Sequence, residues 1–350
     1  MHNIGNAYYI YDANGRLSEK RENKKGFRPQ SWRYQWDSED QLTQVTLPDG
    51  EQWQYAYDPF GRRIQKTKTQ NGKGYRPPAP GYERPIRQGS AYQWDGDRLI
   101  QEAPVYADGT VAWDQAETWH YEANSFRPIA KEQNGKLFYI VTDHLGTPRE
   151  MLDEAGIPVW RAKFSVWGEL LDKEAPNDPD YGRQSCNLRF QGQQYDPETG
   201  LHYNRYRYYD PTSAQYLSPD PIGLAGGLTP QAYVHDPNQW VDPLGLNPFY
   251  RGAKAGNSPA FSPRPSDYKV DTSGFVKPTH GVSVFDNPDS VSSKGFEPHE
   301  IKPETVPDSL QIKQRGQDSK HYEIMPKEEG TLTESQYKDE LGKIECKTSS

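Results

Sequence analysis

Aromatic and polar residues alternate in four short stretches of the first hundred residues, and each stretch ends at an aspartate. A period of two is typical of a strand that buries one of its faces. The aspartate and the Gly, Asn or polar residues after it suit a tight turn, and an aliphatic residue then begins a return strand. Each stretch therefore predicts a β-hairpin, and such hairpins must stack to bury their apolar faces. The four aspartates are Asp12, Asp37, Asp58 and Asp95.

Strand and turn patterns continue as far as residue 211. Between residues 187 and 211, two predicted strands flank an Asp-Pro-x-x-Gly turn. The second of these strands alternates Tyr with Asn and Arg, which predicts one aromatic face and one polar face. Segments 67–88 and 172–183 are rich in Pro, Gly or polar residues, so they predict loops.

A pentapeptide occurs twice between residues 220 and 246, and the composition changes after the second copy. Asp220 begins the copy Asp-Pro-Ile-Gly-Leu, and Asp242 begins the copy Asp-Pro-Leu-Gly-Leu. Both copies demand tight turns, because Pro and Gly restrict the backbone in complementary ways. All nine Trp residues precede Asn247. The second copy therefore predicts a domain boundary.

The composition limits the classes of protein that fit. The mean hydropathy is −1.04, but aromatic residues make up 13% of the chain and can build a core. The net charge is −8, and neither side of Asn247 has the basic excess expected of a protein that binds nucleic acid by charge. Two cysteines without CxxC spacing predict neither a disulfide framework nor a metal site. No signal peptide or membrane span is apparent, which predicts synthesis in the cytoplasm.

Four segments that follow one another in order resemble the core of the Rhs family of polymorphic toxins. They are the Tyr-Asp (YD) repeats, residues 142–150, residues 188–211 and the two pentapeptides. The resemblance implies a mainly β fold, in which a solenoid of YD/Rhs-repeat hairpins forms a partial shell before a small α+β C-terminal domain. The implied domains are a repeat scaffold over residues 1–186, an Rhs-associated core over 187–246 and a toxin domain over 247–350.

The same resemblance implies that the core cuts itself after the second pentapeptide. Asp220 and Asp242 would be the catalytic carboxylates, and Leu246–Asn247 would be the scissile bond. Two carboxylates brought close together do not both ionise easily, so one can activate water while the other donates a proton. Arg205 or Arg207 would orient or screen the pair, and no cofactor is expected for the core. The alternative is that both pentapeptides are ordinary turns.

The residues after Leu246 predict a small α+β domain composed mostly of strands. Segments 306–316 and 321–324 have strand patterns. Thr333 followed by Gln336 has the spacing of a capping box, which predicts a short helix over 333–344.

The chemistry of this domain is predicted from a layout similar to that of ADP-ribosyltransferase toxins. Arg251 would bind the phosphates of NAD, Ser283 would support the ribose pocket, and Glu323 would stabilise the oxocarbenium-like centre. His280 and the glycine after it resemble the His-Gly of another transferase subclass, which would also place His280 at the NAD site. NAD is thus the expected substrate.

Two other functions stay open. In a nuclease, acid–base or metal chemistry would fall to the histidines and to one glutamate, namely His280, His299, His321 and Glu323. The second alternative is a non-enzymatic β-scaffold or binding protein. If the chain is a toxin, its expected partners are an immunity protein, components of a type VI secretion apparatus and a protein or RNA of the target cell. It would then act in interbacterial competition after delivery into a neighbouring cell.

Overall fold

The structure is a computed structural model, and its chain divides into two compact units. The first unit comprises residues 1–219 and 231–245, and the second comprises 220–230 and 246–350. Asn247 of the predicted scissile bond lies outside the described residues, as do 77–84 and 173–183 of the predicted loops. The structure describes residues 2–23, 25–76, 85–123, 125–172, 184–222, 229–234, 236–238, 240–246, 250–254, 257, 259, 261–285, 291–301, 305–307, 309–314 and 321–346.

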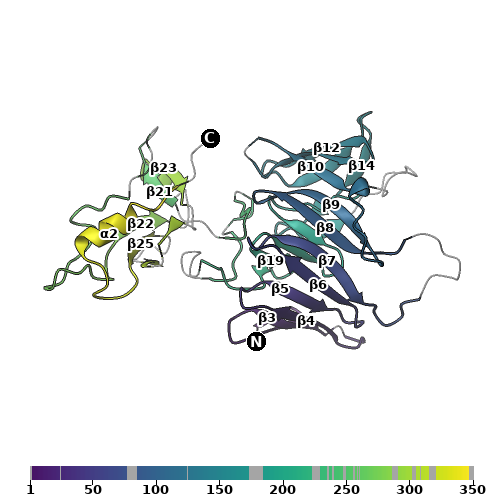
Figure 1. Ribbon diagram of the computed structural model, residues 1–350, viewed down its shortest axis with the longest axis horizontal. Coiled ribbons are helices and arrows are strands. Elements are labelled where there is room, and N and C mark those ends of the chain that lie inside the picture. The colour runs from purple at the N-terminus through teal and green to yellow at the C-terminus, as the bar shows by residue number, and fades with distance from the viewer. Residues whose placement is uncertain are drawn as a thin grey trace. The chain divides into compact units, whose positions relative to one another are not determined.

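The first unit is built on one fourteen-stranded sheet whose strand order follows the chain, β1 to β14 (Figure 1). Every neighbouring pair whose register is resolved is antiparallel, as in a series of hairpins. This arrangement confirms the predicted mainly β, hairpin-repeat fold. The strands are β1 (His2–Ile4), β2 (Ala7–Tyr11), β3 (Leu17–Glu22), β4 (Gln30–Trp36), β5 (Leu42–Thr46), β6 (Gln52–Tyr57), β7 (Arg63–Gln70), β8 (Arg87–Asp95), β9 (Arg98–Tyr106), β10 (Glu117–Tyr121), β11 (Pro128–Gln133), β12 (Lys136–Thr142), β13 (Pro148–Leu152) and β14 (Pro158–Arg161).

The aspartates that end the repeats organise the hairpin turns. Asp12 Oδ1 accepts hydrogen bonds from the amides of Asn14 and Arg16, both at 2.9 Å. Asp37 and Asp58 accept the equivalent pairs of amide bonds in their own turns. Asp95 differs, because it pairs directly with Arg98 across a two-residue turn. Three of the four repeats therefore share one side-chain-capped turn, as the pattern predicted.

Three smaller elements complete the first unit. The helix η1 (Trp113–Gln115) follows β9. A two-stranded sheet consists of β15 (Lys163–Phe164) and β16 (Leu170–Asp172). A four-stranded sheet contains β17 (Gln194–Asp196), β18 (Leu201–Asn204), β19 (Arg207–Asp210) and β20 (Gln215–Tyr216) in that order.

The four-stranded sheet corrects two predictions. The single strand expected after the Asp-Pro-x-x-Gly turn is broken at Arg205, which has φ 53°, so the chain reverses between β18 and β19. The expected polar face is also wrong, because all eight residues of these two strands are buried. Tyr203 and Tyr208 pack into the same apolar cluster as Tyr9 and Leu17 of the large sheet. The predicted loop over 67–88 is shorter than expected, since β7 continues to Gln70 and β8 begins at Arg87.

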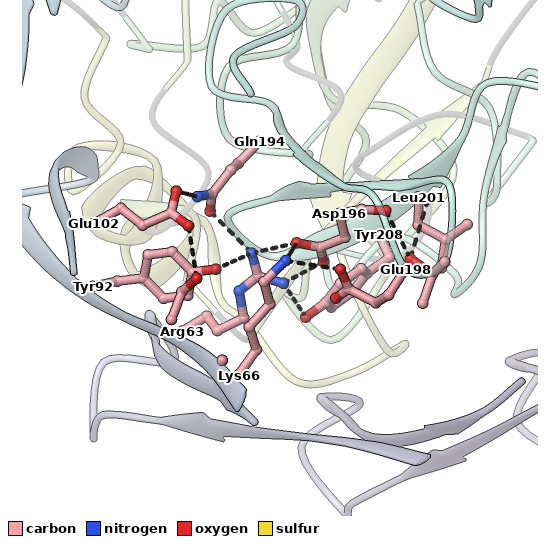
Figure 2. A network of polar contacts seen from close by, with 12 residues as sticks. Arg63, Lys66, Tyr92, Glu102, Gln194, Asp196, Glu198, Leu201 and Tyr208 are labelled. Carbon is pink, nitrogen blue, oxygen red and sulfur yellow. Dashed lines mark hydrogen bonds and ion pairs between the residues drawn. The ribbon is translucent and has the colours of Figure 1, made fainter. Parts of the chain in front are cut away.

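A buried polar network joins the large sheet to the four-stranded sheet (Figure 2). Arg63 on β7 forms two ion-paired hydrogen bonds with Asp196 on β17, at 2.5 and 3.0 Å. Lys66 donates to Asp196 at 2.8 Å and to Glu198 at 3.0 Å. The Arg63 guanidinium also lies over the ring of Tyr203, 4.4 Å from its centroid. Arg63 and Asp196 have no solvent exposure, so the two sheets are joined by charge as well as by apolar packing.

The second unit contains a five-stranded sheet in the order β23-β21-β22-β25-β24. The buried core on this sheet includes Val282, Ile324 and Tyr337. The helix begins after Thr333 with the predicted capping box, in which Thr333 and Gln336 bond each other reciprocally. The elements are β21 (Tyr250–Ala253), β22 (Val282–Phe285), β23 (Glu297–Glu300), β24 (Leu310–Gln314), β25 (His321–Pro326) and α2 (Glu334–Leu341).

Helices able to cross a membrane are absent from the described part of the chain.

Candidate self-cleavage site and C-terminal pocket

The carboxylate of Asp242 is buried in the first unit and is held by side chains of the four-stranded sheet. The Tyr216 hydroxyl donates to Asp242 Oδ2 at 2.8 Å. Arg207 Nη2 lies 3.6 Å from the same oxygen. The Asp242 amide donates to the Tyr233 hydroxyl at 3.3 Å. Asp242 is thus a buried charge with a cation and a hydroxyl donor beside it, which is the arrangement that a buried carboxylate requires.

The turn between β18 and β19 binds the main chain of the second pentapeptide through three carbonyl oxygens. Asn204 Nδ2 donates to the Asp242 carbonyl at 2.9 Å, and the Tyr206 amide donates to the Leu244 carbonyl at 3.1 Å. Arg207 Nε donates to the Gly245 carbonyl. We call these three donor residues the carbonyl clamp. The clamp fixes the backbone of the four residues that lead to Leu246.

Two glycines allow this close approach of main chain to main chain. Gly245 has φ 73°, and a Cβ built there would lie 2.5 Å from the Asn204 carbonyl oxygen. Gly192 has φ 82°, and a Cβ there would overlap the carbonyl oxygen of Pro243. The glycine of the pentapeptide is therefore required by the clamp as well as by its own turn.

Replacing Gly192 by alanine should destabilise the first unit by about 3 kcal/mol, because a strained backbone and an overlap with Pro243 add together. Gly200→Ala is the matched control, since Gly200 has φ 77° but no atom lies within 4 Å of its added Cβ. That control should cost about 1 kcal/mol. Urea unfolding followed by Trp fluorescence measures both. Equal losses in the two variants would show that contact with Pro243 is unimportant.

The remaining residues predicted for self-cleavage are distributed as follows. Asp220 belongs to the second unit and is buried, and its Oδ1 accepts from the Ile222 amide at 3.1 Å. Arg205 is directed elsewhere: it bonds Asp97 at 2.6 Å and the Phe60 carbonyl at 2.7 Å. Of the two arginines predicted to support the carboxylates, Arg207 is the one placed beside Asp242.

Sequence reasoning missed Asn204, Tyr216 and Tyr233. All three lie in a tyrosine-rich stretch, where a functional hydroxyl cannot be told from a core aromatic. Burial first, and then the nearby charge of Asp242, raises the pKa of Tyr216 well above its ordinary value. The pKa of Tyr233 is raised for the same two reasons in the same order. Both hydroxyls therefore stay protonated.

The second unit brings three predicted residues onto adjacent strands. Arg251 lies on β21, Ser283 on β22 and Glu323 on β25, and Ser283 is paired in register with Glu323. Arg251 Nη1 donates to the Ser283 carbonyl. Burial lowers the pKa of Arg251. The sheet thus gathers the arginine, serine and glutamate that the sequence separates by up to 72 positions (323 − 251).

A pocket of about 540 Å³ opens at this site. Arg251, Ser283 and His321 line it, and His321 Nε2 lies 3.0 Å from Ser283 Oγ. Arg264 and Lys294 add positive charge to the wall, and Asp267 adds one negative charge. Its apolar wall consists of Phe285, Val291 and Phe296. A lining that combines cationic side chains with the aromatic rings of Phe285 and Phe296 suits a ligand that combines phosphate with a flat ring.

Glu323 is anchored at the start of β22. Its Oε2 accepts from the Gly281 amide at 3.0 Å. A Cβ at Gly281 would overlap the Ile324 carbonyl oxygen, so this approach requires glycine. His280 precedes this glycine, and its Nδ1 lies 3.1 Å from the hydroxyl of the adjacent Thr279. His280 is not among the residues that line the pocket.

The residues proposed for the nuclease alternative are not gathered in the same way. His299 is buried on β23, which lies at the far side of β21 and β22 from β25. The described residues contain no group of three or more His, Cys, Asp or Glu side chains able to hold a metal ion.

Comparison with known proteins places the first unit in a family. The family model of the RHS repeat matches residues 11–51 and 36–74, and that of the teneurin YD-shell matches residues 116–239. The probable deoxyribonuclease RhsA of Dickeya dadantii is 39% identical over 243 residues, which are 68% of this chain and 15% of RhsA. The chain belongs to the Rhs family of polymorphic toxins.

Other relatives carry different activities in their names. Double-stranded DNA deaminase toxin A of Burkholderia cenocepacia is 34% identical over 69% of this Rhs chain and 17% of its own length. Toxin protein Tse5 of Pseudomonas aeruginosa is 30% identical over 68% of this chain and 18% of its own length. The chain thus spans less than a fifth of the length of these relatives. The solved crystal structure of TcdB2-TccC3 aligns with 69% of this chain and 14% of its own, at 20% identity and a TM-score of 0.48.

Proposed function

We propose that this Rhs chain is part of an antibacterial toxin, in which the scaffold cuts the chain after Leu246 and frees an enzymatic C-terminal domain. The observation that carries the first step is the carbonyl clamp. The clamp binds three carbonyl oxygens in the four residues before Leu246, namely those of Asp242, Leu244 and Gly245. A backbone fixed in this way lowers the entropic cost of presenting the next bond for attack.

The proposed step is hydrolysis of the Leu246–Asn247 peptide by Asp220 and Asp242. Water attacks the Leu246 carbonyl carbon while one carboxylate takes a proton from it. The carbon–nitrogen bond then breaks, its electron pair goes to the Asn247 nitrogen, and the other carboxyl group donates a proton to that nitrogen. The products are a Leu246 carboxylate and an Asn247 amine. No cofactor takes part.

Asp242→Asn and Asp220→Asn should each abolish the cut, because an amide can neither take nor donate the required proton. Intact mass measurement of the purified full-length chain tests this, with wild type giving a fragment that ends at Leu246. Asp236→Asn is the control, since Asp236 lies in the same segment and caps a turn by accepting from the Asn238 amide at 2.9 Å. Persistence of the fragment in both variants would refute the aspartyl mechanism.

For the freed domain we propose NAD-dependent ADP-ribosyl transfer. The support is the placement of Arg251, Ser283 and Glu323 on adjacent strands, with Arg251 and Ser283 in the lining of one pocket. Arg251 would bind the phosphates of NAD, with positive charge added by Arg264 and Lys294. Glu323 would stabilise the charge that develops on the ribose as nicotinamide leaves. His280, predicted for the same site, would act from the loop just before β22, the strand that carries Ser283.

A nuclease is the second candidate, because relatives of the scaffold are named a deoxyribonuclease and a tRNA nuclease. One experiment separates the two. The wild-type chain is incubated with labelled NAD and cell lysate, and both protein labelling and nucleic-acid integrity are followed. Transfer of label supports the transferase. Degraded nucleic acid without label supports the nuclease. The absence of both label transfer and degradation would favour a non-enzymatic binding protein.

The relatives named as toxins also support proposals about partners. An immunity protein would protect the producing cell, and a secretion apparatus, proposed to be of type VI, would deliver the chain into a neighbouring cell. The target would be a protein or RNA of that cell. Expression of the chain without an immunity protein should therefore stop bacterial growth. Healthy growth at a confirmed level of soluble, cleaved chain would count against a toxic domain.

A further inference from the structure

Arg189 is a buried arginine whose charge has no acidic partner among the residues that the structure describes. Only 3% of the residue is exposed. Its Nη1 donates to the carbonyls of Cys186 and Leu188, at 2.9 and 2.8 Å, and both acceptors are neutral. Arginines are almost never fully buried unless an anion accompanies them. The protein groups around Arg189 therefore leave its charge uncompensated.

Two aromatic rings contact the Arg189 guanidinium without neutralising it. Its central carbon lies 4.3 Å from the ring centroid of Tyr195 and 5.1 Å from that of Phe164. Such contacts attract a cation but supply no negative charge. Burial lowers the pKa of Arg189 to about 10, so the guanidinium is still charged at neutral pH. The thiol of Cys186 gives no compensation, because burial raises its pKa to about 11.

A cavity of about 20 Å³ lies beside Arg189, and Gln193 also lines it. A cavity of about 10–15 Å³ is large enough for one water molecule. Two buried donors of these residues, Arg189 Nε and Gln193 Nε2, have no hydrogen-bond partner in the described part of the chain. The other end of the Gln193 amide is engaged, since its Oε1 lies 2.8 Å from His202 Nδ1. Buried N–H groups are nearly always bonded, so both donors require an acceptor that the protein does not supply.

The charges around the cavity favour an anion over water. Among the described residues that line it, Asp97 is the one carboxylate, and its side chain is 42% exposed and pairs with Arg205 at 2.6 Å. His202 is neutral, because burial first and then the charge of Arg189 lower its pKa well below the ordinary value. One positive charge, that of Arg189, is left over. Water would accept from both donors but would bring no charge, whereas an anion does both.

We propose that this cavity is a binding site for one small monovalent anion of the size of chloride, held by Arg189 Nε and Gln193 Nε2. The ion accepts a hydrogen bond from each donor and neutralises the guanidinium. The small volume suits a single-atom ion rather than a polyatomic one. The ion is a structural counter-ion of the first unit and takes no part in a reaction.

The anion would stabilise the turn over residues 189–193. The Arg189 amide donates to the Gln193 carbonyl at 2.9 Å, and the Gln193 amide donates to the Phe190 carbonyl at 2.8 Å. Gly192 of this turn lies against the carbonyl oxygen of Pro243 in the second pentapeptide. An ion that bridges Arg189 and Gln193 connects the two ends of the turn, so it supports the backbone on which that pentapeptide packs.

A chloride titration of the full chain tests the site. The chain is held in urea near its midpoint of unfolding, and sodium gluconate keeps the ionic strength constant. Trp fluorescence reports the first unit, which contains all nine Trp residues. For a dissociation constant of about 5 mM, raising chloride from about 1 to about 100 mM should multiply the folded-to-unfolded ratio by roughly 18. An unchanged ratio would overturn the proposal and assign the cavity to water.

Two substitutions connect the chloride effect with this cavity. Gln193→Glu places a carboxylate beside Arg189 and keeps an oxygen for His202, so it should replace the ion and remove the dependence on chloride. Arg189→Met removes the charge and should remove the dependence as well. Arg33→Met is the control, because the Arg33 side chain is 72% exposed, and it should respond as wild type does. A wild-type response in either cavity variant that folds would place the ion elsewhere and overturn the proposal.

Bromide locates the ion directly. Crystals of the full chain soaked in sodium bromide should show an anomalous difference peak within hydrogen-bond distance of Arg189 Nε and Gln193 Nε2. Crystals of Arg189→Met should show none at that place. A wild-type crystal without this peak overturns the proposal, whatever the titration gives.

Discussion

Asp196→Asn is expected to lower the free energy of unfolding of the first unit by about 3–5 kcal/mol, the usual cost of removing one partner of a buried ion pair. Asp196 accepts from Arg63 at 2.5 and 3.0 Å and from Lys66 at 2.8 Å (Figure 2). The asparagine leaves both cations buried with less compensating charge. The loss is therefore dominated by uncompensated burial rather than by the attraction itself.

Urea unfolding followed by Trp fluorescence measures this effect, because all nine Trp residues belong to the first unit. Asp95→Asn is the matched control. Its carboxylate pairs with Arg98 at 2.7 Å, but the Asp95 side chain is 62% exposed, so the control should cost at most about 1 kcal/mol. A loss of that size in Asp196→Asn would show that the network is dispensable.

The Asp196 network also predicts a dependence on pH. Burial alone would raise the pKa of Asp196, but Arg63 and Lys66 outweigh it and leave the pKa below its ordinary value. A depressed folded-state pKa contributes stability that is present above the unfolded-state value, about 4, and is lost as the pH falls through the folded-state value. The difference in stability between wild type and Asp196→Asn should therefore shrink on acidification below about pH 4.

Glu323→Gln is expected to reduce transfer of label from NAD by about 10²–10³-fold, the range seen when a group that stabilises transition-state charge is removed. Glutamine keeps the size of the side chain and can still accept from the Gly281 amide, so the anchoring of β25 to the start of β22 should survive. In the proposed mechanism, the variant lacks the charge that would stabilise the developing ribose cation. Label transfer per mole of freed domain is the measurement.

Glu329→Gln is the control for this loss. Glu329 is an exposed residue of the turn after β25, and the substitution changes the net charge by the same amount. It should transfer label at the wild-type rate. Equal rates in all three chains would show that the charge of Glu323 does not contribute to the transfer, and would direct attention to the residues that line the pocket.

The sequence predicted the hairpins well because their turns are local. Asp12 and the amides it caps lie within four residues, so the pattern alone contains the interaction. The turn at Arg205 was missed because a non-glycine residue adopts positive φ there. Contacts made at long range hold that turn, including the bond from Arg205 to Asp97, 108 positions away. No local pattern encodes such a contact.

The residues of the candidate sites likewise divide into those that the sequence predicts and those that only long-range contacts reveal. Asp220 and Asp242 were predicted from the resemblance of their pentapeptides to those of the Rhs family, and Arg207 was suggested by its position on a strand that precedes them. Tyr216 was not found, because a tyrosine that donates to a carboxylate has the same sequence signature as one that only fills a core. Arg251, Ser283 and Glu323 were suggested by their order in the chain, but only the sheet order makes their strands neighbours.

The ion pair between Arg63 and Asp196 has a consequence for the timing of folding during synthesis. Its partners are 133 residues apart, which at the usual pace of translation separates them by roughly 7–27 s. Over that interval β7 has been synthesised but its charged partner has not. The aromatic face of the early hairpins therefore stays exposed to solvent until the four-stranded sheet is made. Asp242 leaves the ribosome later still. A cut at Leu246 would therefore occur only in chains whose scaffold has finished folding. The amount of freed C-terminal domain would then measure the fraction of chains with a folded scaffold.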